Sequence, residues 1–202
     1  MNDEKKNRKH KQSMQALKSR VDSSIAAAQT EKGLCVLLSG DGKGKSTSGF
    51  GMVMRSLGYG HRVGIVQFIK GEQLSGEEIY LREKYPDMPF YQMGTGFTWD
   101  TQDRQADIVA AERTWAYAEE LLKNASIDLV LLDELTYMLA FKYLEEEQVV
   151  NAISRRPAQQ SVVITGRGGG TGLRELADTV SEISSPKHAY ESGIKARKGV
   201  DF

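Results

Sequence analysis

LCVLLSGDGKGKST, residues 34–47, is the stretch that decides the fold of this chain. Its first five residues are continuously apolar, which is typical of a short strand buried on both faces of a sheet. The glycines that follow allow successive backbone N–H groups to converge on an oxyanion. Lys45 supplies a cation for the β- and γ-phosphates of a nucleotide, and Ser46 supplies a hydroxyl for Mg²⁺ at the start of a helix. The stretch therefore predicts a phosphate-binding loop between a strand and a helix.

The loop departs from the general phosphate-loop pattern at one position. The pattern G-x-x-x-x-G-K-[ST] places its first glycine at position 39, where this chain has Ser39, and the glycine stands one place later at Gly40. Strand, glycine loop, Gly-Lys-Ser-Thr and helix still occur in the order that phosphate binding needs. Lys43 is an additional cation that either contacts phosphate or is solvated. The predicted nucleotide-binding residues of the loop are Gly40, Asp41, Gly42, Lys43, Gly44, Lys45, Ser46 and Thr47.

A second apolar run, LVLL at 129–132, ends in two acidic residues, Asp133 and Glu134. In phosphate-loop enzymes a carboxylate after such a strand lies beside the loop and binds Mg²⁺ directly or through water. The alternative is that the pair begins a helix as an N-cap. Together with the loop, the acidic pair predicts a nucleoside triphosphate bound with Mg²⁺, for which Mn²⁺ is an alternative. Glu134 and Ser46 are the predicted metal ligands, and Asp133 is either a third ligand or a group that supports them.

Strand and helix patterns alternate along the rest of the chain. This alternation predicts an α/β fold with a mostly parallel central sheet flanked by helices, in which ligands bind outside the carboxyl ends of the strands. Further strands are predicted at 62–68, 90–93, 128–132, 161–165 and 179–183. Helices are predicted at 46–57, 103–123, 145–154 and 173–177.

The N-terminal segment differs from the remainder, and we divide the chain into an arm of residues 1–32 and an α/β domain of residues 33–202. The arm begins with a basic stretch and continues with apolar residues spaced by three or four, which predict a helix with one narrow apolar stripe. A stripe this narrow favours a helix that docks on the domain or on a partner chain, whereas a solvated arm and a nucleic-acid-binding arm are the alternatives. The stripe consists of Met14, Leu17, Val21, Ile25 and Ala28.

Composition excludes several classes of protein. The 27 Lys and Arg residues balance the 27 Asp and Glu residues, so no overall positive field attracts nucleic acid. The single cysteine, Cys35, lies in an apolar run; it is expected to be a core residue and cannot form an internal disulfide or a cysteine-based zinc site. No run approaches the ~18 apolar residues that span a membrane, and no apolar signal core is present at the N-terminus. We therefore expect a cytoplasmic protein without a membrane or nucleic-acid partner.

Four further stretches narrow the family. They are VQFIKG at 66–71, GTGFTWD at 94–100, LDELTY at 132–137 and TGRG at 165–168. With the phosphate loop, and from about residue 13 to the C-terminus, the chain resembles the ATP:corrinoid adenosyltransferases. The resemblance implies a RecA-like phosphate-loop NTPase fold, a homodimer, and an N-terminal helix that helps to close the site. It also implies transfer of the 5′-deoxyadenosyl group of ATP to the cobalt of a reduced corrinoid such as cobalamin or cobinamide, with release of triphosphate and with a flavoprotein as electron donor.

The same resemblance assigns roles to individual residues. Phe97 and Trp99 are expected to pack against the corrin face, where they exclude an axial ligand that makes Co(II) difficult to reduce. From their positions in the sequence, three cationic residues are also expected to contact the nucleotide, with solvated side chains as the alternative. Arg55 lies on the helix that follows the loop, whereas Lys70 and Arg167 lie just past the carboxyl ends of predicted strands. His188 is interpreted as a packed or surface histidine rather than a cobalt ligand.

The chain departs from familiar members of the family at three places. Asp41 stands where asparagine is expected and Ser46 where threonine is common, and both keep the acceptor or hydroxyl that the loop needs. The segment 168–172 is richer in glycine than the resemblance predicts.

Two other functions share parts of this pattern. A phosphate-loop kinase or NTPase would release ADP from ATP, whereas the adenosyltransferase releases triphosphate only when a reduced corrinoid is present. A GTPase is disfavoured because the Asn-Lys-x-Asp guanine-reading sequence is absent. A RecA-like nucleic-acid-binding module would bind polynucleotide through the basic arm in a salt-dependent way.

Overall fold

The structure is a computed structural model that describes residues 2–69, 74–94, 103–168 and 170–201. Two compact units are present, Met1–Glu31 and Lys32–Phe202. Among the described residues, no helix is both long and apolar enough to cross a membrane.

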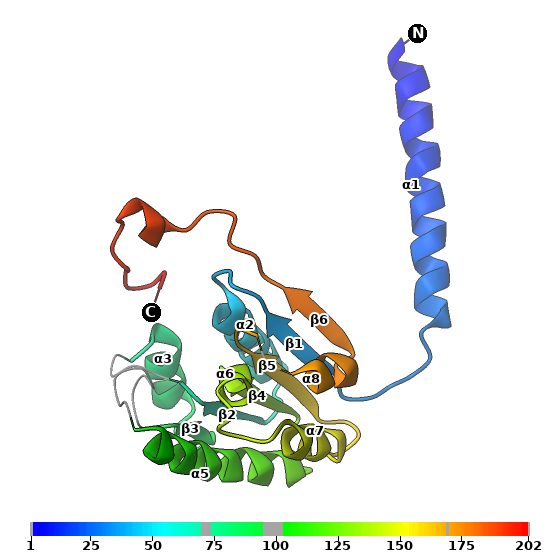
Figure 1. Ribbon diagram of the computed structural model, residues 1–202. Helices are drawn as coiled ribbons and strands as arrows, with labels where there is room; N and C mark the ends of the chain where they lie inside the picture. The colour runs from blue at the N-terminus through cyan, green and yellow to red at the C-terminus, as the bar shows by residue number, and fades with distance from the viewer. Residues whose placement is uncertain (1, 70–73, 95–102, 169, 202) are drawn as a thin grey trace. The chain divides into compact units, whose positions relative to one another are not determined.

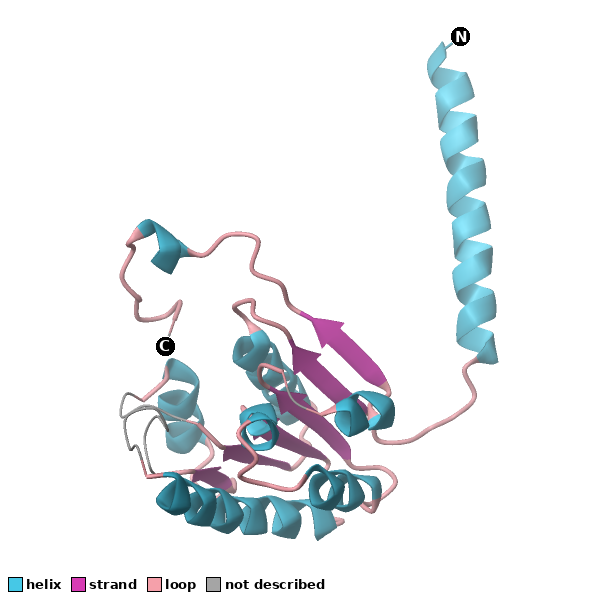
Figure 2. Ribbon diagram, viewed as in Figure 1, coloured by secondary structure: helices cyan, strands magenta, loops and turns pink. Residues whose placement is uncertain are grey.

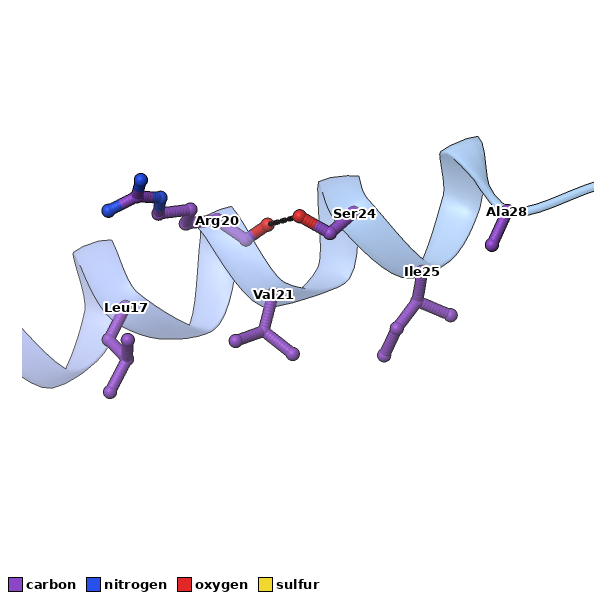
Figure 3. A pocket seen from close by; sticks show the side chains of 6 residues that line it. All are labelled: Leu17, Arg20, Val21, Ser24, Ile25 and Ala28. Carbon is purple, nitrogen blue, oxygen red and sulfur yellow. Dashed lines mark hydrogen bonds between the residues drawn. The ribbon is translucent and has the colours of Figure 1, made fainter. Parts of the chain in front are cut away.

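The first unit consists mainly of α1 (Asn2–Ala27), so the predicted helix of the arm is present. Leu17, Val21 and Ile25 project from the same side of this helix (Figure 3) and are exposed to 53%, 46% and 67%. Together with three neighbours in the same unit they border a shallow hollow; the neighbours are Arg20 and Ser24 on α1 and Ala28 just after it. Within its own unit the apolar stripe is therefore left exposed.

The second unit is built around a six-stranded sheet with the order β3-β2-β4-β5-β1-β6 (Figure 1). Every pairing between these strands is parallel, which confirms the α/β prediction. The strand β5 lies between β1, which leads into the phosphate loop, and β4, which leads into the acidic pair. The strands are β1 (Cys35–Ser39), β2 (Val63–Gln67), β3 (Phe90–Gln92), β4 (Leu129–Asp133), β5 (Ser161–Thr165) and β6 (Thr179–Glu182).

Helices cover both faces of the sheet (Figure 2). One core cluster joins α2 and α3 to the sheet through residues such as Phe50, Val53 and Leu81. The other joins α5, α6, α7 and α8 to the opposite face, and Trp115 and Met138 are among its fully buried side chains. The helices are α2 (Lys45–Gly58), α3 (Gly76–Lys84), α5 (Arg104–Lys123), α6 (Leu135–Ala140), α7 (Glu146–Ser154) and α8 (Thr171–Leu176), followed by a short 3₁₀ helix, η1 (Ala189–Ser192).

Cys35 is a core residue of β1, as the sequence predicted, with only 1% of its surface exposed. Burial raises the pKa of its thiol from 9.0 to about 11. The thiol is therefore neutral at physiological pH and behaves as a small apolar side chain.

Candidate functional site

The phosphate loop runs from the carboxyl end of β1 to the start of α2, where the sequence placed it. Gly40 and Gly44 have φ angles of 98° and 116°, a region that side chains other than glycine rarely adopt. A Cβ on Gly40 would lie 2.4 Å from the carbonyl oxygen of Ile183, just after β6. The N–H of Gly42 donates to the same carbonyl at 2.7 Å. The loop is thus held against the chain that follows β6, and only glycine permits this approach.

Lys45 opens α2 and is buried, with 5% of its surface exposed. Its Nζ donates a hydrogen bond of 2.9 Å to the carbonyl oxygen of Gly42, so the side chain folds back across its own loop. Burial lowers the pKa of this ammonium, while the nearby carboxylate of Glu134 acts in the opposite direction. Ser46 is half-buried and Thr47 exposed in the first turn of the same helix.

Lys43 is exposed at the rim of the loop and forms an ion pair of 2.9 Å with Asp201, near the C-terminus. The second carboxylate oxygen of Asp201 accepts the backbone N–H of Arg197 at 2.8 Å. The C-terminal segment therefore places an acidic side chain against the phosphate loop. Sequence reasoning missed this contact, because more than 150 residues separate Asp201 from Lys43 and no motif contains it.

Asp133 is the last residue of β4 and is 2% exposed. Its Oδ1 accepts the hydroxyl of Thr165 at 2.6 Å, and its Oδ2 accepts the side-chain amide of Gln67 at 2.9 Å. The hydroxyl oxygen of Thr165 in turn accepts the backbone N–H of Glu134 at 2.9 Å. One threonine on the intervening strand thus fixes both members of the acidic pair.

Glu134 has a φ angle of 59°, which is rare for a residue other than glycine. It stands at the N-cap position of α6, but its side chain makes no capping hydrogen bond, so the alternative interpretation of a capping pair does not describe its contacts. Burial, reinforced by Asp133, raises the pKa of its carboxyl to about 7. Its Oε2 is buried without a hydrogen-bond partner in the described part of the chain. A buried carboxylate oxygen without a donor is costly unless a ligand completes it.

The donor set around Glu134 fits a hard cation that also binds phosphate. Within the described ranges, no group of three or more His, Cys, Asp or Glu side chains is arranged to hold a metal alone. Mg²⁺ in nucleotide sites uses one or two carboxylates and a hydroxyl, and its remaining ligands are water and substrate phosphates. Glu134, with its unpartnered oxygen, and Ser46 match this limited protein contribution.

The other predicted residues fall into three groups. Arg167 is exposed just after β5, and its positive charge opposes the rise in the pKa of Glu134. Arg55 lies in the last turn of α2, about 15 Å along the helix from Lys45, and the described structure gives it no hydrogen bond or ion pair to the loop. Lys70, Phe97 and Trp99 lie outside the described residues.

His188 caps the short helix η1. Its Nδ1 accepts the backbone N–H of Tyr190 at 3.2 Å, which is a local structural contact. The interpretation of His188 as a packed or surface histidine stays a prediction.

Residues 31–202 match the family described as ATP:corrinoid adenosyltransferase BtuR/CobO/CobP. The chain is 50% identical over 197 residues to a corrinoid adenosyltransferase of Pseudomonas aeruginosa, covering 98% of this chain and 97% of the relative. It is 47% identical over 194 residues to the corrinoid adenosyltransferase of Escherichia coli K12, covering 96% and 98%. It is 45% identical over 194 residues to that of Salmonella typhimurium, with the same coverage.

Proposed function

The chain belongs to the ATP:corrinoid adenosyltransferase family, and we propose that its phosphate loop binds the triphosphate of ATP as a leaving group. The activity of the protein is the transfer of the adenosyl group of ATP to a corrinoid, a step of cobalamin biosynthesis. The observation that supports the proposal for the loop is the buried Lys45, whose ammonium lies across the loop close to Glu134.

The proposed reaction is a displacement at C5′ of the ribose. The cobalt of the reduced Co(I) corrinoid attacks C5′ with an electron pair and forms the Co–C bond. The C5′–O bond breaks, and its electron pair leaves on triphosphate, so cobalt becomes formally Co(III). Negative charge develops on the departing oxygen, and fixed cations and dipoles aimed at this position lower the barrier. We assign this role to Lys45 with the loop amides, and to Lys43 at the rim.

We propose that Glu134 and Ser46 hold Mg²⁺, or Mn²⁺ in its place, against the triphosphate. The metal, when bound, neutralises part of the phosphate charge. The unpartnered Oε2 of Glu134 supports this assignment, and the hydrogen bonds to both oxygens of Asp133 favour a supporting role for Asp133. Arg167 lies at the same sheet edge and is assigned to the nucleotide. Arg55 and Lys70 are assigned to the nucleotide from their positions in the sequence alone.

Phe97 and Trp99 keep their predicted role at the corrin face, where their aromatic rings exclude an axial ligand from cobalt. A flavoprotein is proposed as the electron donor that generates Co(I). The single buried cysteine is in keeping with a reducing, cytoplasmic compartment.

The decisive test of this function is anaerobic incubation of the protein with ATP, Mg²⁺ and chemically reduced cobalamin. We expect spectral conversion to a light-sensitive Co–C product and release of one triphosphate for each corrinoid consumed. Formation of ADP without consumption of corrinoid would instead indicate a kinase or hydrolase.

Replacing Asp201 by asparagine should tighten binding of ATP and of inorganic triphosphate. The carboxylate of Asp201 forms an ion pair with the Lys43 ammonium, which is proposed to contact phosphate. The carboxylate therefore competes with the phosphate groups of the nucleotide for Lys43. The gain should be about two- to five-fold and should vanish at high salt, because exposed ion pairs are weak and screened. Titration calorimetry with inorganic triphosphate measures the effect. The control is Glu191→Gln in the same tail; unchanged or weaker binding by Asp201→Asn would contradict the competition.

We propose that the protein is a homodimer in which α1 docks through its apolar stripe and helps to close the site. The exposure of Leu17, Val21 and Ile25 on one side of α1 supports a docking role, since a solvated helix gains nothing from such a stripe. Replacing these three residues by serine should leave the α/β domain folded, because none of the three belongs to either core cluster. The KM for corrinoid should rise several-fold and the dimer should weaken, which steady-state kinetics and analytical ultracentrifugation measure. Unchanged values for both would refute the docking role.

A further inference from the structure

An unbroken chain of side-chain hydrogen bonds begins at Asp133 and crosses three strand ends. Gln67, the last residue of β2, donates its amide to Asp133 at 2.9 Å. The side-chain amide of Gln92, the last residue of β3, donates to the side-chain amide oxygen of Gln67 at 2.9 Å and to the carboxylate of Glu78 at 2.7 Å. Glu78 lies on α3, where its other oxygen accepts Nε of Arg82 at 2.9 Å. We call Gln67, Gln92 and Glu78 the glutamine relay.

Burying the polar side chains of the glutamine relay costs free energy. Gln67 is 3% exposed and Glu78 is 1% exposed, and Gln67 closes a strand whose five residues are all buried. An apolar side chain at such a position avoids the cost of burying polar groups, so a buried polar chain needs a reason. The relay has a definite direction: both glutamine amides point their N–H groups toward carboxylates, with Asp133 at one end and Glu78 at the other.

The consequence for Asp133 is a fixed orientation. Thr165 donates to one carboxylate oxygen and Gln67 to the other, from the strands on either side of β4. A carboxylate held in this way cannot rotate, and it leaves Glu134 as the adjacent group with an unpartnered oxygen. Groups that hydrogen-bond to ligands in a metal site set ligand orientation and affinity.

We infer that Gln67 and Gln92 are positioning residues of the transfer reaction, which fix Asp133 and through it the Mg²⁺–triphosphate site. The inference rests on the metal assignment of the proposed function. Neither glutamine touches the nucleotide in this role. Their effect is on the geometry of the acidic pair, anchored on α3 by Glu78.

The test replaces Gln67 by leucine, which keeps the volume and removes the donor to Asp133. Binding of Mn²⁺ in the presence of ATP, measured by electron paramagnetic resonance, should weaken by about ten-fold or more, the usual size for loss of a group that supports metal ligands. The KM for corrinoid should stay unchanged. Gln92→Leu leaves the Gln67 donor in place and should give a smaller loss in the same direction; it also serves if Gln67→Leu does not fold.

Gln160 provides a matched control, because it is a buried glutamine that precedes β5 at the opposite end of the sheet. It is 2% exposed, and its amide donates to the backbone carbonyls of Leu121, Asn124 and Ile127. Gln160→Leu should lower the unfolding temperature without changing Mn²⁺ affinity.

The two proposals fail in different ways. If Glu134→Gln binds Mn²⁺ with ATP as tightly as the wild type, the metal assignment is wrong and the relay falls with it. If Glu134→Gln loses the metal while the Gln67 and Gln92 variants keep affinities within two-fold of the wild type, the relay alone is refuted.

Discussion

Lys45→Ala should lower the rate of adenosyl transfer by at least about 100-fold, the usual cost of removing one fixed donor from a site of developing negative charge. The Lys45 ammonium is buried, folded across the loop and close to Glu134, so it is held in place before the reaction begins. Water cannot replace it as a fixed cation at the departing triphosphate. Formation of the Co–C species under anaerobic conditions, with saturating ATP and reduced cobalamin, measures the rate.

Lys43→Ala is the matched control for this prediction. It removes a lysine from the same loop, but this one is exposed and already paired with Asp201. Its effect should be less than about ten-fold, in line with the weakness of exposed charge pairs. The unfolding temperature of Lys45→Ala should not fall, because burial disfavours this ammonium. A Lys45→Ala protein that turns over at the wild-type rate would overturn the role of the loop.

The strands and long helices of the α/β domain followed from local sequence, and the structure confirms them to within a few residues. Two helices, α3 and α6, were not predicted from local sequence. α3 buries only Glu78 and Leu81, so its sequence carries no apolar stripe, and its start depends on Ser75 accepting the N–H of Glu78. α6 is only six residues long and follows directly from Glu134 in a left-handed conformation, which has no periodicity to detect. Helices this short, whose start depends on one capping residue or one unusual torsion angle, cannot be predicted from hydrophobic periodicity.

The motifs located the loop and the acidic pair, but they could not give the strand order. Because β5 pairs directly with β4, Thr165 reaches both Asp133 and the backbone of Glu134. The same order explains Gly166, since a Cβ there would lie 2.1 Å from Oγ1 of Thr136. These contacts join segments about 30 residues or more apart in the sequence, and no spacing rule encodes them.

Two glycines of the segment 168–172, whose glycine content the family resemblance did not explain, pack against α7. The N–H of Gly172 donates to Oε1 of Glu146 on α7 at 2.7 Å. A Cβ on Gly170 would lie 2.5 Å from that same oxygen. At Gly170, whose φ angle is 65°, and at Gly172, a side chain would have to displace this carboxylate, whereas a Cβ on Gly168 would meet nothing within 4 Å.

Glu134→Gln should raise the Mg²⁺ concentration needed for half-maximal activity by at least about ten-fold, because loss of even a supporting group in a metal site typically costs 10- to 100-fold in affinity. The substitution keeps the shape of the side chain and removes the charge. Its Oε2 is buried, has no hydrogen-bond partner in the described chain, and lies in a carboxyl group close to Lys45 and Asp133. Such an oxygen is available to a cation, and a neutral amide cannot replace it as a Mg²⁺ ligand with equal strength. Activity measured over a range of Mg²⁺ concentrations at saturating ATP gives the shift.

Glu119→Gln separates this effect from the general loss of a carboxylate. Glu119 lies on α5 and accepts hydrogen bonds from Trp115, Lys123 and Gln148, away from the acidic pair. Its replacement should change stability by roughly the 0.2–1 kcal/mol of an exposed ion pair and leave the Mg²⁺ dependence unchanged. Removing Mg²⁺ with a chelator should lower the activity of the wild type to that of Glu134→Gln at low Mg²⁺ concentration. Adding back a low concentration of Mg²⁺ should restore the activity of the wild type but not that of Glu134→Gln. If Glu134→Gln instead responds to Mg²⁺ as the wild type does, the unpartnered oxygen is not a metal ligand, and the triphosphate must be neutralised by Lys45, Lys43 and Arg167 without it.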